Sequence, residues 1–507
     1  MIKIIQIFIC VLLFPTIIQA KSNVITPLQF GLREAVTDVD RFKVLYKTHV
    51  EAIKKGFNIK YEGIDTIRIE IPKDAKTIPL PKETDFGNVV IVVRNNSMNT
   101  TLFSMINPIE KYTIGIEMLE GKTEIADKGN FIISIEDSVP WVKNRVGYGY
   151  GFNRKDILYV NNGVIEGSIL SSYQTEESKP IISRSYVELT PKIIKNLSVI
   201  RDSRSTYKTF VIKIENQYNV IISNLSIKTP PNKWFGDTAI RLDNCYKVII
   251  HQTTIDGTYS QRDKYGYGIT MINVSDVEIN DLYAHANWGV FGNNNVSNIR
   301  LKKCDINRFD VHCYGKDVYF NRCVFRNLYN QFSSMYGTVS FQNCVFINFV
   351  PVLIEPSYNA YTKFDLRFKN CTIYANKERR YLISGGNFNN RNMESRKELQ
   401  KQEFPNLYID GLKIKMQERL DHYYIYKFNR HLIQWPNDSI PGLIKIKRLK
   451  FVPNIRNVLR TTNLQSFVRY PDSDYLQTLT IGGIVFLFAS GGCWYYHYKE
   501  GKNSLRV

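Results

Sequence analysis

The sequence has few residues of the kinds that build metal sites, and it lacks the short motifs of the common nucleotide and hydrolase sites. Its 507 residues include 8 cysteines and 7 histidines. No two cysteines form a Cys-x-x-Cys pair, which leaves a structural zinc site without support. A glycine-rich phosphate loop, a His-Glu-x-x-His motif, a Gly-x-Ser-x-Gly motif and a clustered acidic run suited to calcium are also missing. We therefore expect no metal and no cofactor.

The composition excludes several classes of protein and indicates an anionic partner. Hydrophobic residues make up 44% of the chain and charged residues 22%, which excludes disordered, collagen-like and minimal disulfide-stapled chains. Lysine and arginine total 67 against 47 acidic residues, giving a formal net charge of +20. Such a charge attracts acidic polysaccharide, nucleic acid or an anionic membrane surface.

The N-terminal segment narrows this choice of partner. Lys3 precedes an uncharged apolar run from Ile4 to Leu13, and the segment closes with Ile18-Gln19-Ala20. This layout is typical of a secretory signal peptide, here residues 1–20, with a retained membrane anchor as the alternative. In either case we expect the rest of the chain to be exported, to the periplasm or the outside of a bacterial cell, so nucleic acid is not an expected partner.

A second apolar segment lies near the C-terminus. Residues 476–496 carry no charge and are long enough to span a membrane as a helix. Basic residues follow, so residues 497–507 would form a cytoplasmic tail and the C-terminal helix would tether the protein to the membrane. Gly482, Gly483, Gly491 and Gly492 leave a buried glycine-rich hairpin as the alternative.

A short pattern recurs along the chain: apolar, any, apolar, any, any, small or apolar, any, apolar. Because residues i and i+2 of a strand share a face, each copy indicates two short strands with a bend between them. Most copies follow one another at roughly 20 to 40 residues, which indicates a β-solenoid whose coils must stack to bury their faces. The copies begin at Leu158, Lys192, Val220, Val248, Val277, Ile299, Val318, Val339, Leu366, Leu407 and Ile444.

The sixth position of the pattern also supports stacking. It holds Cys304, Cys323, Cys344 and Cys371 in consecutive copies and leucine in most others. Free cysteine behaves as a small buried hydrophobe, so we expect these four side chains to form an interior ladder rather than disulfides or a metal site.

The chain before the repeats has a different character. Residues 40–55 show helical spacing at Phe42, Leu45, His49 and Ile53, and Gly56 follows as a helix cap. Because an open solenoid end exposes strand edges, we expect residues 21–150 to form an N-terminal cap with the first coils. Residues 151–455 would then form the solenoid, and residues 456–475 a linker.

The stacked pattern, of which Val220-Ile-Ile222-Ser-Asn-Leu225-Ser-Ile227 is one copy, resembles the right-handed parallel β-helix of the pectate-lyase-like superfamily over about residues 60–455. The resemblance implies an all-β fold of about 11 coils behind a helix-containing cap. It also implies carbohydrate, because that superfamily is dominated by polysaccharide lyases, glycoside hydrolases and phage depolymerases, with non-catalytic members as well. The repeat carries little information about chemistry.

The densest group of ionisable residues is Arg308, Asp310 and His312, which strand alternation places on one face. A polysaccharide lyase needs a base for the proton next to a uronate carboxylate and a cation that neutralises that carboxylate. His312 or His285 could serve as the base, and Arg308 or Arg326 as the cation. A hydrolase instead needs two carboxyl groups, for which Asp310 with Asp256 or Asp263 could serve. A structural Asp310–His312 ion pair is the remaining alternative.

Aligning the coils suggests a substrate-binding surface beside this group. Counting from the repeat places Trp288, Asp310 and Tyr329 in one file and His312 with Gln331 in another. Aromatic rings can stack on sugars, and Arg or Lys can meet uronate or sulfate groups, although a solvated loop would have the same composition. The predicted binding residues are Tyr259, Arg262, Lys264, Tyr265, Trp288, Arg326 and Tyr329.

These observations together predict an exported, membrane-tethered β-helix protein that acts on an acidic polysaccharide. Lyase-like cleavage is the favoured enzymatic reaction, and glycoside hydrolysis is the second. Non-catalytic glycan binding or polysaccharide assembly is the alternative from a different class.

Overall fold

The computed structural model describes residues 23–452 with internal gaps, and short strands within residues 477–506. The gaps are residues 97–99, 143–151, 171–172, 174–177, 206, 230–236, 258–265, 286–287, 355–362, 377, 380, 386–404, 417–423 and 429–443. The predicted signal peptide, residues 1–20, and the predicted binding residues Tyr259, Arg262, Lys264 and Tyr265 lie outside the described residues.

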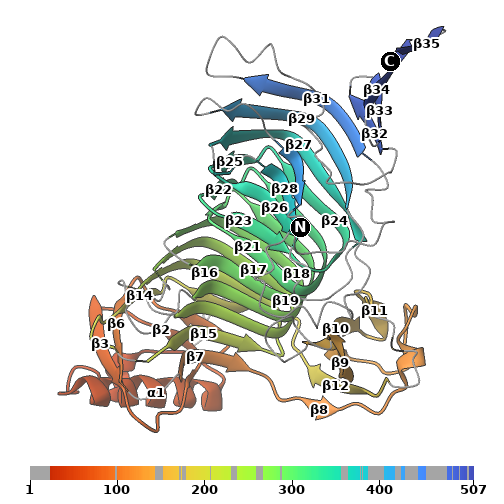
Figure 1. Ribbon diagram of the computed structural model, residues 1–507. Coiled ribbons are helices and arrows are strands. Elements are labelled where there is room, and N and C mark those ends of the chain that lie inside the picture. Colours follow the sequence, from red (N-terminus) through yellow and green to blue (C-terminus); the bar gives the residue numbers. More distant parts are fainter. Residues whose placement is uncertain are drawn as a thin grey trace, which may run out of the picture.

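The chain forms a parallel β-helix whose coils stack from the N-terminal cap, at the bottom of Figure 1, to β31 near the top. A full coil has three faces. Face 1 carries the first half of the repeat, face 2 the second half, and face 3 the strand that precedes the next copy. Strands confined to face 1 are β1 (Val24–Ile25), β2 (Asn58–Lys60), β5 (Glu83–Asp85), β13 (Lys192–Lys195) and β24 (Met335–Gln342).

The other two faces are built in the same way. Face 2 contains β3 (Thr66–Ile71), β6 (Val90–Asn95), β14 (Ser198–Arg201), β20 (Asp305–Ile306), β22 (Val324–Arg326) and β25 (Val345–Ile347). Face 3 contains β4 (Ile78–Pro79), β7 (Thr100–Ile106), β15 (Thr209–Glu215), β23 (Tyr329–Phe332), β26 (Val350–Ile354), β28 (Tyr381–Gly385) and β30 (Tyr424–Phe428). Longer strands bend from one face to the next: β16 (Tyr218–Lys228), β17 (Thr238–Asp256), β18 (Tyr267–His285), β19 (Gly289–Lys302), β21 (Phe309–Asn321), β27 (Lys363–Ala375), β29 (Asn406–Met416) and β31 (Ile444–Val452).

The register of face 1 confirms the repeat from its second copy onward. Lys192, the start of that copy, pairs with Val220, and the same register continues coil by coil to Leu407 and Ile444. The bend expected inside each copy is a residue with a left-handed backbone at the fifth position, which Asn tolerates better than most residues do. These residues are Asn196, Asn224, Gln252, Asp281, Lys303, Arg322, Asn343, Asn370, Gly411 and Arg448.

The interior of the solenoid is a continuous stack of apolar side chains. The expected ladder of Cys304, Cys323, Cys344 and Cys371 is confirmed, because all four thiols are buried and unpaired. Phenylalanines stack beside them, with ring centroids 4.8 Å apart for Phe320 and Phe341. Each coil thus buries its inner face only against its neighbours.

A single α-helix among the described residues covers the N-terminal end. Helix α1 (Asp38–Lys55) begins after the Thr37 cap and ends at Gly56, whose φ of 66° is left-handed. Its buried side chains include Phe42 and Leu45, whereas Ile53, predicted to face the core, is 46% exposed. The short 3-10 helix η1 (Pro27–Phe30) precedes α1. The helix predicted over residues 40–55 is confirmed.

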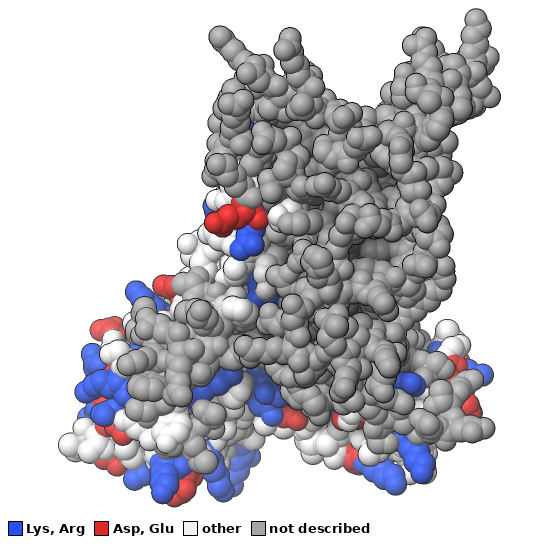
Figure 2. All heavy atoms as spheres, in the orientation of Figure 1, with Lys and Arg blue, Asp and Glu red and all other residues white. Residues whose placement is uncertain are grey.

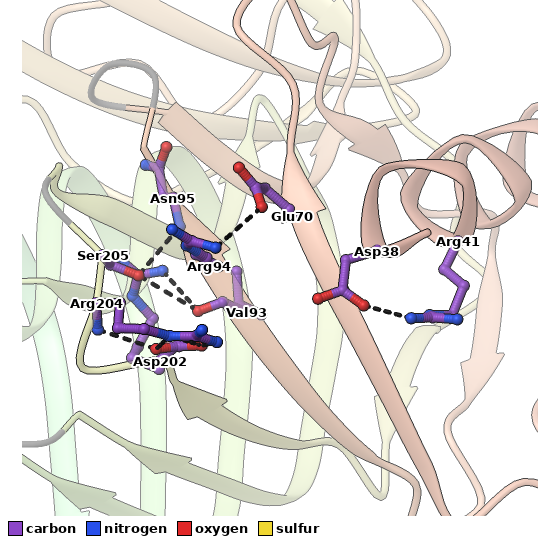
Figure 3. A network of polar contacts seen from close by, with 10 residues as sticks. Asp38, Arg41, Glu70, Val93, Arg94, Asn95, Asp202, Arg204 and Ser205 are labelled. Carbon is purple, nitrogen blue, oxygen red and sulfur yellow. Dashed lines mark hydrogen bonds and ion pairs between the residues drawn. The ribbon is translucent and has the colours of Figure 1, made fainter. Parts of the chain in front are cut away.

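Polar contacts fix the turns next to this cap (Figure 3). The hydroxyl of Ser205 accepts a hydrogen bond from the backbone N–H of Asn95 at 3.0 Å, which ties the turn after β14 to the end of β6. In the same region Arg94 Nη1 lies 3.5 Å from Glu70 Oε2. Asn95 and Ser205 are buried, whereas the Arg94 and Glu70 side chains are about one-third exposed.

A five-stranded antiparallel sheet interrupts the early coils and was not anticipated from the sequence. In spatial order it contains β11 (Val164–Glu166), β10 (Phe152–Asn161), β9 (Asn130–Val142), β12 (Pro180–Tyr186) and β8 (Glu110–Lys111). The first copy of the repeat, at Leu158, lies in β10 and does not stack with the others. The 3-10 helix η2 (Ile116–Met118) connects β8 to β9.

This sheet docks on the side of the coils, at the lower right of Figure 1. Tyr159 of β10 stacks on Tyr218 of β16 with ring centroids 4.0 Å apart. Tyr314 donates a hydrogen bond to the buried carboxylate of Asp156 at 3.1 Å. The inserted sheet and the solenoid therefore share an interface that is both aromatic and hydrogen-bonded.

The C-terminal segment differs from the prediction. Residues predicted to form a membrane-spanning helix over 476–496 instead form the antiparallel strands β32 (Gln477–Ile481), β33 (Ile484–Ala489) and β34 (Gly492–Lys499), followed by β35 (Lys502–Arg506). The glycine pairs at 482–483 and 491–492 interrupt the run, and the run is rich in β-branched and aromatic residues, which favour strands. Among the described residues, no helix is long and apolar enough to cross a membrane.

Candidate functional site

The predicted group of Arg308, Asp310 and His312 lies where β21 begins on face 3. Asp310 pairs in register with Gly292 of β19 and Gln331 of β23, so three consecutive coils meet at this point. The register shifts beyond Asn293 because Asn293 pairs with Val311 and Asn294 with Cys313. His312 is the extra residue of this bulge, and bulges of this kind re-aim a side chain.

Asp310 is the centre of the group. Its carboxylate is fully buried and accepts a hydrogen bond from Arg308 Nε at 2.6 Å and from the Tyr267 hydroxyl at 3.0 Å. His312 Nε2 lies 3.5 Å away. Burial acts to raise the pKa of Asp310, but the charge of Arg308 and the hydrogen bond from His312 outweigh it and hold that pKa below its ordinary value of 3.8. Asp310 is therefore ionised at neutral pH.

Arg308 is enclosed by protein groups on all the sides that the structure describes. Its guanidinium lies between the Trp288 ring, 4.8 Å from its centroid, and the Tyr329 ring, at 4.5 Å. Nη2 donates to Gln331 Oε1 at 2.9 Å, and the side chain is only 4% exposed. Burial would lower the pKa of Arg308, but the charge of Asp310 raises it above its usual range. The geometry favours a role in positioning Asp310 over direct contact with a substrate carboxylate.

Tyr267, which was not among the predicted site residues, completes the site. It is the first residue of β18, and its hydroxyl lies 3.0 Å from both Asp310 Oδ2 and His312 Nε2. Its ring occupies the space left by Gly292, where an added Cβ would lie 2.7 Å from Tyr267 Cδ2. A glycine inside a strand often marks such a close approach, so Gly292 was the signal available in the sequence.

His312 is the member of the group that solvent reaches. Its side chain is 14% exposed, whereas that of Asp310 is fully buried. An imidazole that contacts both a hydroxyl and an ionised carboxylate can accept a proton and be stabilised as the imidazolium. The arrangement can therefore perform general acid–base chemistry.

His285 and Arg326 belong to a separate cluster on face 2. Both contact Asp305, His285 Nε2 at 2.9 Å and Arg326 through two nitrogens at 2.9 and 3.0 Å. Burial would raise the pKa of Asp305, but the hydrogen bonds from His285 and Arg326 lower it. The structure thus brings these two residues to Asp305.

The predicted files differ from the observed register on face 3. Asp310 pairs with Gly292 and Gln331, not with Trp288 and Tyr329. The corner between faces 2 and 3 varies in length, with β18 ending at His285 and the next face-3 strand starting at Gly289, so counting onward from the repeat loses register. Trp288 and Tyr329 still reach the site, because both stack on Arg308.

The described residues hold no group of three or more His, Cys, Asp or Glu side chains that could bind a metal ion. Asp310 and His312 supply only two such side chains, and Arg308 occupies one side of the carboxylate. The roles predicted for Arg308, Asp310, His312 and His285 stay predictions.

Comparison with known proteins gives similar solved structures at low sequence identity. No protein-family model matches the chain, and no curated protein matches it. It is similar to the tailspike protein gp49 of Pseudomonas phage LKA1, with 12% identity, 85% of this chain and 78% of that chain covered, and a TM-score of 0.47. It is also similar to the A-module of the Azotobacter vinelandii mannuronan C-5 epimerase AlgE4, with 10% identity, 84% and 95% coverage, and a TM-score of 0.41.

A third similar structure is PfbA, a surface adhesin of Streptococcus pneumoniae, with 11% identity, 95% and 99% coverage, and a TM-score of 0.34. The resemblance to parallel β-helix proteins seen in the repeat is confirmed by the strand register of this chain itself. Its chemistry rests on its own residues.

Proposed function

We propose that this chain acts on an acidic polysaccharide and cleaves it by elimination next to a uronate carboxylate. The observation that carries the proposal is the contact of the Tyr267 hydroxyl with both Asp310 and His312, which leaves the imidazole as the solvent-reached member of an ionised cluster. The net charge of +20 supports an anionic substrate.

In this reaction His312 takes the proton from the sugar carbon next to the carboxylate. The electron pair of that C–H bond forms a C=C bond as the bond to the glycosidic oxygen breaks, and the leaving oxygen takes the proton back from the imidazolium. Asp310 stabilises the imidazolium by its charge, and Tyr267 orients the ring. Arg308 holds Asp310 in place.

The cation that neutralises the substrate carboxylate must come from elsewhere, because Arg308 is enclosed. Arg262 and Lys264 precede Tyr267 closely in the sequence and remain the proposed substrate-binding cations, with Tyr259 and Tyr265 as stacking residues. Trp288 and Tyr329 each lie against Arg308, so any sugar contact would use their opposite ring faces.

Two other functions can be weighed on the same residues. Non-catalytic glycan binding is favoured by the mutual pairing of Arg308 and Asp310, which satisfies both charges without a substrate. Glycoside hydrolysis needs two accessible carboxyl groups, and Asp310 is fully buried. Asp256 ends β17 on face 2, and Asp263 lies outside the described residues.

The test is turnover of a panel of uronic-acid polysaccharides, followed by the absorbance of unsaturated uronate. We expect turnover by the wild type and a loss of about 10²-fold or more in His312→Ala. Tyr267→Phe should lower kcat with KM unchanged, because Tyr267 acts through His312. The matched controls are His251→Ala, in β17 on face 1, and Tyr283→Phe, at the far end of β18 from Tyr267.

The outcome separates the candidate functions. Turnover that persists in His312→Ala would remove the proposed base. New reducing ends without unsaturated uronate would indicate a hydrolase, and saturable binding without any product would indicate non-catalytic glycan binding.

Export of the chain is part of the proposal and rests on the apolar segment from Ile4 to Leu13. The measurement is N-terminal sequencing of the chain recovered from outside the cytoplasm. A mature chain that begins at Lys21 supports cleavage after residue 20, and recovery only from the cytoplasm contradicts export.

A further inference from the structure

The last coils carry an unusual excess of positive charge. The described strands β27, β29 and β31 contain nine basic residues and two acidic ones. The basic residues are Lys363, Arg367, Lys369, Lys413, Lys415, Lys445, Lys447, Arg448 and Lys450. The acidic residues, Asp365 and Asp410, are each already paired, with Arg367 at 2.7 Å and Arg448 at 2.7 Å. Within the described strands β27, β29 and β31, basic residues therefore clearly outnumber acidic ones.

The register of these strands places two lysines directly opposite each other, whereas Lys369 and Lys447 lie opposite Asp410. Lys413 of β29 pairs directly with Lys450 of β31, and successive coils lie about 4.8 Å apart. Within the described part of the chain, Lys413, Lys445, Lys447 and Lys450 form no salt bridge. Like charges placed directly opposite each other destabilise a sheet. An anionic ligand bound at this position would reduce the repulsion between Lys413 and Lys450.

The N-terminal cap provides the contrast. On helix α1 the lysines alternate with acids that pair with them, such as Lys43 with Asp40 at 3.7 Å and Lys55 with Glu51 at 3.1 Å. Figure 2 shows the same mixture of blue and red side chains over the cap and first coils. Excess positive charge in the last coils is thus a local feature and not a uniform consequence of the net charge.

We infer that faces 1 and 2 of β27, β29 and β31 form a second binding surface, which holds a linear acidic polysaccharide. The outward side chains between the cations include Thr372, Tyr374 and Tyr408, which offer hydroxyl groups and aromatic rings to a sugar. Amide and acidic side chains also lie there, among them Asn370 and the two paired aspartates. Tyr408 lies under Arg367, with the guanidinium 4.7 Å from the ring centroid, and Tyr374 accepts a hydrogen bond from Lys415 at 3.0 Å. In β27 and β29 the aliphatic and phenylalanine side chains all face the interior, which favours a polysaccharide over a membrane.

This surface, called here the basic end, is distinct from the acid–base site. The site lies on face 3 at β21, and β24 separates its coil from β27 on face 1. The inference rests on the proposed function for its ligand class only. The basic end would hold a long substrate while the site around His312 acts on another part of the polymer.

The experiment measures binding of polygalacturonate to the full chain. The test variant replaces Lys413, Lys445, Lys447 and Lys450 by glutamine, and the matched control replaces Lys43, Lys47, Lys54 and Lys55 of α1 by glutamine. Both variants lose the same charge. We expect the basic-end variant to bind at least about tenfold more weakly, the cap variant to bind like the wild type, and the difference to shrink as salt screens the charges.

Three results would overturn the inference. One is equal affinity of the basic-end variant and the wild type. Another is an equal loss in the cap variant, which would indicate an effect of net charge alone. The third is a basic end that matters only for vesicles containing phosphatidylserine, which would make the surface a membrane contact.

Failure of the proposed function gives a different signature. Wild-type protein that binds polygalacturonate through the basic end but yields no unsaturated product would disprove the elimination chemistry and leave the basic end intact. The opposite result is turnover that is lost in His312→Ala, together with a basic-end variant that binds and turns over long polymer like the wild type. That result would support the elimination chemistry and disprove the second binding surface.

Discussion

Replacement of Gly292 by alanine tests whether the Tyr267 ring is held in the position on which the site depends. An added Cβ at Gly292 would lie 2.7, 2.8 and 2.9 Å from Tyr267 Cδ2, Cγ and Cε2. Carbon atoms pack at about 3.5–4.0 Å, so the ring must move by several tenths of an ångström or more. Its hydroxyl is held by Asp310 and His312, so the movement has to break or stretch these contacts.

The size of the effect follows from two opposing terms. Overpacking of a well-packed position costs about 1–3 kcal/mol. Replacing glycine by alanine where the backbone is not strained returns about 0.4–1 kcal/mol through the unfolded state. We therefore expect Gly292→Ala to lower the free energy of unfolding by about 1–2 kcal/mol. Turnover should fall as well, because the His312 ring loses the contact that orients it.

Gly268→Ala is the matched control in the preceding coil. Its added Cβ would meet Ile255 Cγ2 and Val290 O at 3.4 Å, which is ordinary contact, so this variant should be neutral or slightly stabilised. Urea unfolding of both variants gives the comparison. A double variant with Tyr267→Ala should recover the stability lost in Gly292→Ala, because the clash is then removed. The reasoning fails if Gly292→Ala is as stable and as active as Gly268→Ala.

Three further predictions concern the buried charges and the core. Asp310→Asn leaves the enclosed Arg308 charge unpaired and should lower the free energy of unfolding in urea by about 3–5 kcal/mol. The control Asp365→Asn breaks an exposed pair with Arg367 and should lower it by less than about 1 kcal/mol. Equal losses in the two variants would contradict the burial argument. The pKa of Asp310 is lowered from 3.8, so its stabilisation is present above that pH and is lost as the pH falls through the lower folded-state pKa. Acid titration of stability should therefore show a steeper loss below about pH 4 in the wild type than in Asp310→Asn, and parallel curves would refute it. Cys344→Asp buries an unpaired charge and should abolish cooperative thermal unfolding, whereas Cys344→Ala should remain folded; an unchanged melting temperature in Cys344→Asp would remove the core ladder.

The architecture could be predicted from the sequence because burial imposes a fixed position on each side chain of a coil. In the copy beginning at Val220, Val220, Ile222, Leu225 and Ile227 all face the interior, and the register of the strands repeats this in later coils. The bend at Asn224 follows from the same pattern, because two strands on different faces need a turn between them. The periodicity of the sequence thus predicts the coils, the bend within each copy and the cysteine ladder.

The periodicity of the sequence does not predict whether neighbouring strands are parallel or antiparallel, or how long the corners between faces are. Leu158 fits the apolar pattern but lies in an antiparallel strand, because alternation is the same in both kinds of sheet. The corner between His285 and Gly289 is longer than the one between Ile306 and Phe309, so positions on face 3 could not be aligned by counting from the repeat. The inserted sheet and the register of Asp310 could therefore not be predicted from the sequence.

Only part of the site could be predicted from the sequence, because the strand pattern is regular and the corners are not. Alternation placed Arg308, Asp310 and His312 on one side of a strand, and the structure brings them together. Which of them reaches solvent depends on Trp288 and Tyr329, whose positions depend on the corners. A local pattern can identify ionisable neighbours, but it cannot tell a positioning residue from one that meets substrate.

The burial of the inner pair separates stability from activity in a way that a surface cluster would not. Arg308 and Asp310 are enclosed, so the charge of each is stabilised chiefly by the other, and loss of either should weaken the fold and the site together. His312 lies at the edge, and its removal leaves the inner pair intact, so it should lower turnover and leave stability within about 1 kcal/mol of the wild type. If the cluster were only a structural ion-pair network, variants of all three residues would differ in stability alone. A His312 variant that is stable and inactive, beside an Asp310 variant that is unstable, is therefore the pattern that distinguishes a catalytic site from a structural one.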